Sequence, residues 1–70
     1  MSKVIVYTLT SCPVSQKAVA DLRARGFEVE ERAVDRKTQW WEEALQYSVT
    51  VPIIIWGEDE VEIGWEGEHG

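Results

Sequence analysis

The sequence predicts one small α/β domain over residues 1–70, with a four-stranded mixed sheet and helices on its faces. Two runs rich in β-branched apolar residues are typical of strands buried on both faces. Two segments with helical periodicity separate these runs, and a short turn near the end of the chain joins the last two strands. The predicted order is therefore β-α-β-α-β-β, and 70 residues allow only a small core.

The first strand is expected over residues 3–8, which read KVIVYT and are almost all apolar. A helix should follow from Pro13, because proline lacks the N–H that the first helical turn leaves unbonded. Apolar residues then recur every four positions, at Val14, Ala18 and Leu22. Gly26 is expected to end this helix at Arg25 as a left-handed cap.

Residues 27–34 alternate between apolar and charged side chains, which predicts a strand with one wet face. A second helix is expected over residues 35–48. Its stripe would consist of Trp41, Ala44, Leu45 and Ser48, and Asp35 or Thr38 would cap it. Adjacent helical positions point about 100° apart, so we expect Trp41 to pack in the core and Trp40 to be partly exposed.

The last two strands are expected over residues 50–56 and 60–65, joined by a turn at residues 57–59. So short a connection predicts an antiparallel hairpin, whereas the first two strands, joined through a helix, should be parallel. The alternation in the final strand places Val61, Ile63 and Trp65 on one face.

The chain has 13 acidic and 7 basic residues and a net charge of −6. This balance argues against nucleic-acid and anionic-membrane partners, which need a basic face. No apolar run approaches the ~20 residues that span a bilayer, and the first residues do not resemble a secretory signal. A single cysteine forms no internal disulfide, no metal site is expected, and His69 falls in a polar tail expected to be mobile. A cytoplasmic location follows, since thiols stay reduced there.

Cys12, the only cysteine, falls at the N-cap or first residue of the first helix. Free N–H groups and the helix dipole favour an anion at this position, and the thiolate is the nucleophilic form. Thr10, Ser11 and Ser15 offer hydroxyls that could donate to it, and Lys17 adds a positive charge nearby. The alternative is a buried, inert cysteine, which is common for isolated cysteines.

A strand, a Cys-Pro-Val-Ser turn that opens a helix, and Thr50-Val51-Pro52 before a hairpin together resemble the glutaredoxin branch of the thioredoxin fold. The similarity covers about residues 3–65. It implies a thioredoxin-like fold with Cys12 as the catalytic residue. It also implies that Pro52 is a cis-proline beside the sulfur and that the backbone of Val51 pairs with a bound peptide or glutathione.

The resemblance also assigns substrate or glutathione contacts to seven further residues. These are Thr10, Ser11, Pro13, Ser15, Thr50, Gly64 and Glu66. Leu9, Thr10 and Ser11 stand where glutaredoxins usually carry a lysine before the cysteine. Glycine followed by an aromatic residue, as at Gly64, is closer to the redoxins that serve ribonucleotide reductase, which keep two cysteines.

The family's last helix is absent, so Val4, Val6 or residues near Ile54 are expected to be partly uncovered. We expect a partner chain, for instance in a homodimer, to cover such an apolar patch.

Ser15 replaces the second cysteine of a dithiol motif, so the resemblance implies a monothiol thiol–disulfide oxidoreductase that acts in cell redox homeostasis. Its co-substrate would be glutathione, and its substrates glutathionylated or disulfide-containing proteins. One alternative is a carrier of a [2Fe–2S] cluster held between two subunits with glutathione. The other is a non-catalytic module that keeps the fold for binding a partner.

Overall fold

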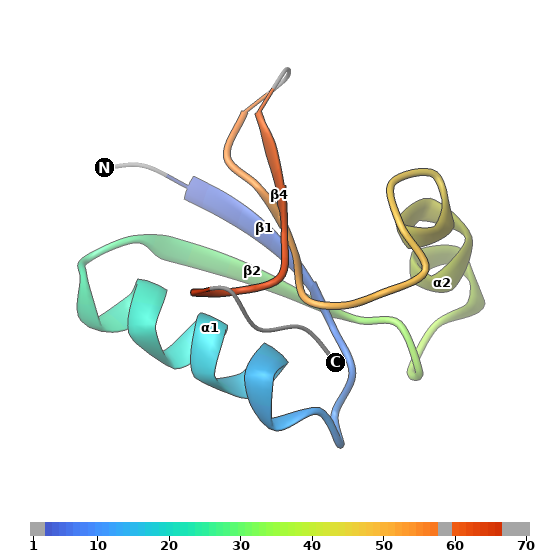
Figure 1. Cartoon of the computed structure of the whole chain (residues 1–70), viewed down its shortest axis with the longest axis horizontal. Helices are drawn as coiled ribbons and strands as arrows, with labels where there is room; N and C mark the ends of the chain where they lie inside the picture. The colour runs from blue at the N-terminus through green and yellow to red at the C-terminus, as the bar shows by residue number, and fades with distance from the viewer. Residues whose placement is uncertain (1–2, 58–59, 67–70) are drawn as a thin grey trace.

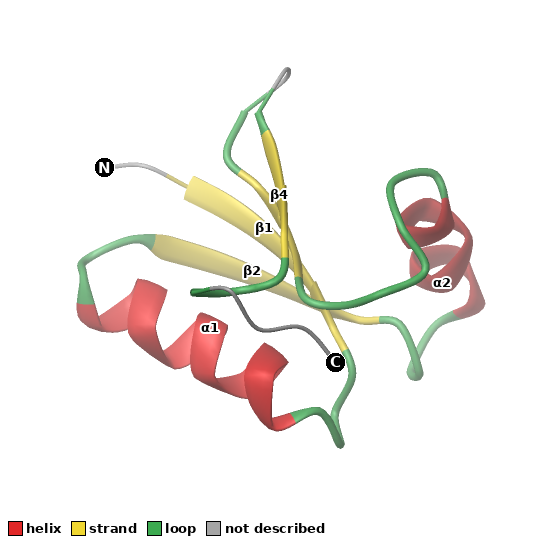
Figure 2. Ribbon diagram, in the orientation of Figure 1, coloured by secondary structure: helices red, strands yellow, loops and turns green. Residues whose placement is uncertain are grey.

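The computed structural model describes residues 3–57 and 60–66, and its elements follow the predicted order (Figures 1 and 2). Their bounds are β1 Lys3–Thr8, α1 Pro13–Ala24, β2 Glu28–Ala33, α2 Thr38–Leu45, β3 Ile53–Ile55 and β4 Val61–Ile63. The four strands form one sheet in the order β2-β1-β3-β4. The chain therefore has the predicted thioredoxin-like α/β fold, and the described residues contain no helix after β4.

The position of β1 in the sheet determines which chain segments meet. β1 pairs with β2 in parallel and with β3 antiparallel, and β3 pairs antiparallel with β4. The carboxyl ends of β1 and β2 therefore lie at the same edge of the sheet, where β3 begins and β4 ends. The segments that follow β1, β2 and β4 meet the segment that precedes β3 at this edge, which we call the reactive edge.

Several elements are shorter than expected, and for α2 and β3 the reason is local. The second helix covers Thr38–Leu45 rather than residues 35–48, and Lys37 is its N-cap, with no side-chain cap. Neither Asp35 nor Thr38 caps it, because the Asp35 carboxylate accepts hydrogen bonds from Thr10 instead. The predicted strand over residues 50–56 begins only at Ile53, after Pro52, which cannot donate to a ladder.

One layer of core lies between the sheet and α1. It contains Val4, Val6 and Ile54 from the sheet, Ala18, Val19 and Leu22 from α1, and Trp65. The expectation that Val4, Val6 or residues near Ile54 would be partly uncovered is wrong, because all three side chains are buried. Trp65, only 4% exposed, packs into this layer and occupies space beside α1. No partner chain is needed to cover this face.

Gly64 explains how Trp65 reaches that layer. Ile54 pairs with Glu62, while Val61 and Ile63 pair with Ile55 and Ile53, so Val61 and Ile63 point away from α1. Gly64 then adopts φ 88°, a backbone conformation that favours glycine, and the chain turns out of the alternation. The expectation that Trp65 shares a face with Val61 and Ile63 is therefore wrong.

Four contacts hold Trp65 and its neighbour Glu66 against α1. The Trp65 indole N–H donates to Asp21 Oδ2 at 2.9 Å, and the Arg25 guanidinium lies 5.0 Å from the centre of the Trp65 ring. Glu66 pairs with Lys17 at 3.3 Å and with Arg25 at 3.7 Å. We call residues 64–66 the strap, because they bind β4 to α1 across the core.

The opposite face of the sheet carries α2. Tyr7, Val34, Ala44 and Ile53 form its core, and Trp40 packs against them. Trp40 is partly buried, whereas Trp41 is 48% exposed, so the expectation that Trp41 packs in the core is wrong. Ala44 is the one buried residue of α2, so few apolar contacts hold this helix.

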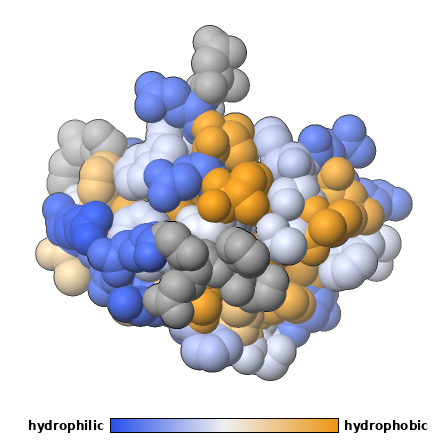
Figure 3. Space-filling view, viewed as in Figure 1, coloured by the Kyte–Doolittle hydropathy of each residue, from blue (hydrophilic) through white to orange (hydrophobic). Residues whose placement is uncertain are grey.

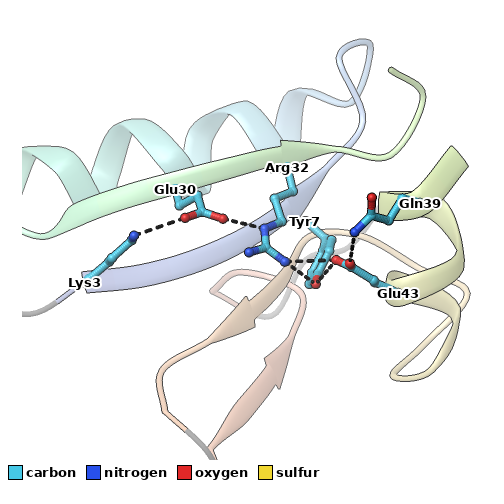
Figure 4. A network of polar contacts seen from close by, with 6 residues as sticks. All are labelled: Lys3, Tyr7, Glu30, Arg32, Gln39 and Glu43. Atoms are coloured by element: carbon cyan, nitrogen blue, oxygen red, sulfur yellow. Dashed lines mark hydrogen bonds and ion pairs between the residues drawn. The ribbon is translucent and has the colours of Figure 1, made fainter. Parts of the chain in front are cut away.

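A network of polar side chains completes the attachment of α2 (Figure 4). Glu43 Oε1 accepts hydrogen bonds from the Tyr7 hydroxyl at 2.8 Å and from Arg32 Nη1 at 2.9 Å. Arg32 also contacts Glu30, which pairs with Lys3 at 3.1 Å. The charged face predicted for β2 is therefore not simply solvated, because Arg32 ties the strand to α2.

Candidate active site

Cys12 and the segment around Pro52 both lie at the reactive edge. Cys12 follows β1 after a short turn, and Val51 and Pro52 directly precede β3. The N–H of Gly64, at the end of β4, donates to the carbonyl of Pro52 at 2.8 Å. The fold thus gathers the three motifs that the sequence singled out, from strands that are distant in the chain.

The cysteine sits at the end of a tight turn. The Cys12 N–H donates to the carbonyl of Leu9 at 3.1 Å, and the Cys12 carbonyl accepts the first helical hydrogen bond, from the N–H of Gln16, at 3.1 Å. Cys12 has φ −91° and ψ 112° and is the N-cap of α1, with Pro13 following it. Cys12 therefore stands at the N-terminal end of α1, where the N–H groups of the first turn have no partner within the helix, although no side-chain hydrogen bond caps them.

These surroundings favour the thiolate. Burial raises the pKa of the Cys12 thiol, but the Ser15 hydroxyl and the backbone N–H groups of Ser15 and Val14 outweigh it and lower the pKa overall. Ser15 is fully buried and its hydroxyl forms no hydrogen bond of ordinary geometry within the described residues. That hydroxyl is therefore available to the sulfur. Cys12 is 8% exposed, so little of its surface is open to solvent.

The other hydroxyls expected to donate to the thiol lie elsewhere. Thr10 is exposed, and both its N–H and its hydroxyl donate to the carboxylate of Asp35. Ser11 and Pro13 are also exposed. The sequence interpretation did not pair Asp35 with Thr10, although the predicted strand order indicated that the two residues are close. Asp35 follows one of two parallel neighbouring strands and Thr10 follows the other, so the predicted topology already placed them at one edge.

The segment before β3 is well ordered by local contacts. The Thr50 N–H donates to Ser48 Oγ at 3.1 Å, and the two hydroxyls are 3.1 Å apart. Val51 and Pro52 are buried and the peptide bond between them is cis. Exposed apolar side chains precede this segment, namely Leu45, Tyr47 and Val49.

Further apolar side chains are exposed on the hairpin. Val61 and Ile63 are partly exposed on β4, and apolar side chains gather over β4 and the segment after α2 (Figure 3). Glu66, expected to contact substrate, is exposed and pairs with Lys17 and Arg25. The positive charge expected near the thiol from Lys17 is thus balanced by a carboxylate.

An open hollow adjoins the Cys12 turn on the β2 side. It measures about 390 Å³ and is lined by Thr10, Gln16, Glu31, Ala33, Arg36 and Trp40. Within residues 3–57 and 60–66, no group of three or more His, Cys, Asp or Glu side chains is arranged to hold a metal ion. No helix of this described part is long and apolar enough to cross a membrane. His69 lies outside the described residues.

Comparison with known proteins agrees with this geometry. The family model for glutaredoxin matches residues 4–61, most of the chain. The chain belongs to the glutaredoxin family. No curated protein matches it.

The solved structures that resemble this glutaredoxin-family chain include two redoxins. NrdH-redoxin from Escherichia coli, described as a glutaredoxin-like protein with a thioredoxin-like activity profile, is 25% identical with a TM-score of 0.76. The similarity covers 89% of this chain and 82% of that one. Glutaredoxin grx-1 from Archaeoglobus fulgidus is 22% identical with a TM-score of 0.76, over 94% of this chain and 78% of that one, and supports the fold alone.

Proposed function

We propose that the protein is a monothiol thiol–disulfide oxidoreductase in which Cys12 is the nucleophile and glutathione the co-substrate. One observation carries the proposal. The chain's single cysteine is the N-cap of α1, where the Ser15 hydroxyl and two backbone N–H groups lower its pKa. Thiolate is the form that attacks disulfides, and membership of the glutaredoxin family supports the same chemistry.

The reaction proceeds in two exchanges. The Cys12 thiolate attacks the glutathione sulfur of a protein–glutathione mixed disulfide, which breaks the S–S bond and releases the protein thiolate. The thiolate of a second glutathione then attacks the glutathione sulfur bound to Cys12. This step releases Cys12 as thiolate and forms glutathione disulfide, so each turnover consumes one free glutathione and exchanges the protein's mixed disulfide for glutathione disulfide.

The remaining residues of the reactive edge would hold the substrate. Backbone groups of Val51, beside Pro52, are suited to pair with an extended peptide segment, and the carbonyl of Pro52 is already bonded to Gly64. Two of the proposed contacts, Thr10 and Glu66, have side chains that already bond charged groups, Asp35 for Thr10 and Lys17 and Arg25 for Glu66. Substrate contacts at these two positions would compete with existing bonds.

The proposal is tested by the pH dependence of Cys12 alkylation, followed by mass spectrometry, and by turnover of a glutathionylated peptide. We expect an alkylation pKa below the free-thiol value of about 8.5, protection of Cys12 by prior glutathionylation, and release of the peptide thiol. Cys12→Ser should abolish both labelling and turnover. Turnover that persists in Cys12→Ser would overturn the assignment of the nucleophile.

A second candidate is a non-catalytic module that binds a partner at the reactive edge. It is favoured by the low exposure of Cys12 and by the apolar side chains of Leu45, Tyr47 and Val49 beside the Pro52 segment. An ordinary thiol pKa, slow labelling and no turnover would exclude the first function in favour of this second one.

A further inference from the structure

The turn that carries Cys12 is held from both sides by side chains outside it. The carbonyl of Leu9 accepts the Cys12 N–H and also Gln16 Nε2, at 3.2 Å, from α1. On the other side, Asp35 Oδ1 accepts the N–H of Thr10 at 3.4 Å, and Asp35 Oδ2 accepts the Thr10 hydroxyl. Both oxygens of the Asp35 carboxylate are thus used to hold one residue of the turn.

Asp35 is itself fixed to the sheet. The N–H of Val34 donates to the carbonyl of Thr8 at 2.8 Å, so the pairing of β1 with β2 continues one residue beyond β2. The N–H of Arg36 then donates to the carbonyl of Ala33 at 3.0 Å and closes a turn. Asp35 stands at the tip of that turn, between these two anchored positions.

The turn itself has little else to hold it. Thr10 and Ser11 are exposed, and a single backbone hydrogen bond, from Cys12 to Leu9, closes it. The groups that favour the thiolate belong to α1, namely the Ser15 hydroxyl and the N–H groups of Val14 and Ser15. These groups act only at hydrogen-bond distance, so a small displacement of Cys12 would remove their effect.

We propose that Asp35 is a positioning residue for Cys12, and that its carboxylate braces the Leu9–Cys12 turn so that the sulfur stays against the first turn of α1. This inference rests on the proposed function, because it concerns the reactivity of the same thiol. It assigns Asp35 no contact with the substrate.

The bracing effect of Asp35 and the effect of its charge can be separated, because they change the Cys12 thiol pKa in opposite directions. A carboxylate near a thiol disfavours the thiolate, so loss of the charge alone would lower the thiol pKa. Loss of the brace would raise the thiol pKa, because the sulfur moves away from its donors. Asp35→Asn removes the charge but keeps an acceptor for Thr10, whereas Asp35→Ala removes both. The other charged groups around the reactive edge, Glu31, Arg36, Lys17 and Glu66, are unchanged in both variants.

The experiment measures the rate of Cys12 alkylation against pH in the full chain. For Asp35→Ala we expect a higher thiol pKa and a rate at pH 7 about fivefold lower, the effect of losing one hydrogen bond. The alkylation rate of Asp35→Asn should stay within about twofold of the parent's, because the asparagine still accepts a hydrogen bond from Thr10. Glu28→Gln, which removes one charge at the opposite end of β2, is the matched control and should leave the profile unchanged.

Two results would overturn the proposal. An Asp35→Ala profile equal to the parent's would show that the brace is not needed, and a lowered pKa in both Asp35 variants would show an effect of charge alone. If Asp35→Ala does not fold, Thr10→Val takes its place. Thr10→Val removes the hydroxyl that donates to Asp35 and should raise the thiol pKa, whereas Asp35→Asn should not raise it.

Amide hydrogen exchange separates this inference from the proposed function. The Thr10 N–H, bonded to Asp35, should exchange faster in Asp35→Ala than in the parent, whatever the chemistry of the thiol. A parent with an ordinary thiol pKa and no turnover would refute the proposed function. A reactive parent whose Asp35→Ala variant shows neither faster exchange nor slower alkylation would refute the brace alone.

Discussion

The hydroxyl of Ser15 is buried in the first turn of α1 without a hydrogen bond of ordinary geometry among the described residues. A buried hydroxyl without a partner costs stability, and the same hydroxyl lowers the pKa of Cys12. At the scale of single residues, the site therefore gives up some stability for a more reactive thiol.

Replacement of Ser15 tests this trade-off between stability and thiol reactivity directly. Ser15→Ala should raise the thiol pKa and lower the alkylation rate at pH 7 by about tenfold or more, because a hydrogen bond to a charged group is worth roughly 1.5 kcal/mol or more. At a pH well below the thiol pKa, where no thiolate accepts from the hydroxyl, the same variant should unfold at an equal or higher temperature, since it buries no unpaired hydroxyl. Faster alkylation of Ser15→Ala than of the parent would contradict the role given to this hydroxyl.

Much of the site at the residue scale could be read from the sequence, but not all of it. The N-cap position of Cys12 followed from Pro13 and from the helical stripe behind it. The partner of Thr10 did not, because Asp35 was considered only as a cap for the helix next to it in the chain. A polar residue at the end of a strand can cap the helix that follows it or bond a residue after the neighbouring strand. The sequence does not give the distance across the sheet that decides between these two partners.

At the scale of elements, α2 depends on its polar contacts more than α1 does. The hydrogen bonds donated by Tyr7 and Gln39, together with the nearby Arg32 guanidinium, hold the pKa of Glu43 below its usual range. A carboxyl whose pKa is lower in the folded chain stabilises the fold above the ordinary Glu value of about 4.3. That contribution is lost as the pH falls through the lower folded value.

We therefore expect Glu43→Gln to loosen α2 at neutral pH. Protection of the α2 amides, which is the exchange rate corrected for its intrinsic pH dependence, should be lower in this variant than in the parent and should no longer change with pH in the acid range. Glu42→Gln, one position earlier on the same helix, serves as the control and should exchange like the parent. Equal exchange in all three proteins at neutral pH would show that Trp40 and Ala44 hold the helix without the network.

The elements differ in how well the sequence predicted them. The bounds of β1 were predicted as observed, and those of α1 within one residue, since an apolar run and a proline–glycine pair mark their ends. The prediction for the last strand was wrong about Trp65 because alternation was continued through Gly64. The assignment of Trp41 to the core was wrong because two adjacent tryptophans fit the helical pattern equally well, and only the position of β2 selects Trp40.

At the scale of the whole molecule, the strap takes the place that the family's last helix was expected to occupy beside α1. Trp65 fills the core there, and its indole bonds Asp21 under the Arg25 guanidinium. Removal of a buried tryptophan costs about 3–5 kcal/mol, whereas a small domain is stable by about 5–15 kcal/mol. One side chain thus accounts for a large share of the stability.

Two substitutions at this position should give different results. Trp65→Ala should lower the free energy of unfolding in urea by about 3–5 kcal/mol. Trp65→Phe, which keeps most of the packing and loses the bond to Asp21, should lower it by about 1 kcal/mol. A Trp65→Ala protein as stable as the parent would mean that the strap is not part of the core.

The central position of β1 also has a kinetic consequence. The unit β1-α1-β2 and the hairpin β3-β4 each join neighbouring segments, whereas the pairing of β1 with β3 joins distant ones and closes a long loop. Pairing between distant segments is the slow part of folding, so we expect the two units to form first and dock last. Cys12 would then be placed at the start of α1 before the Pro52 segment docks beside it. A half-folded chain of this kind would react with any small thiol reagent but select no substrate. Pulsed alkylation of Cys12 during refolding would reveal such a species as labelling that precedes the final docking step.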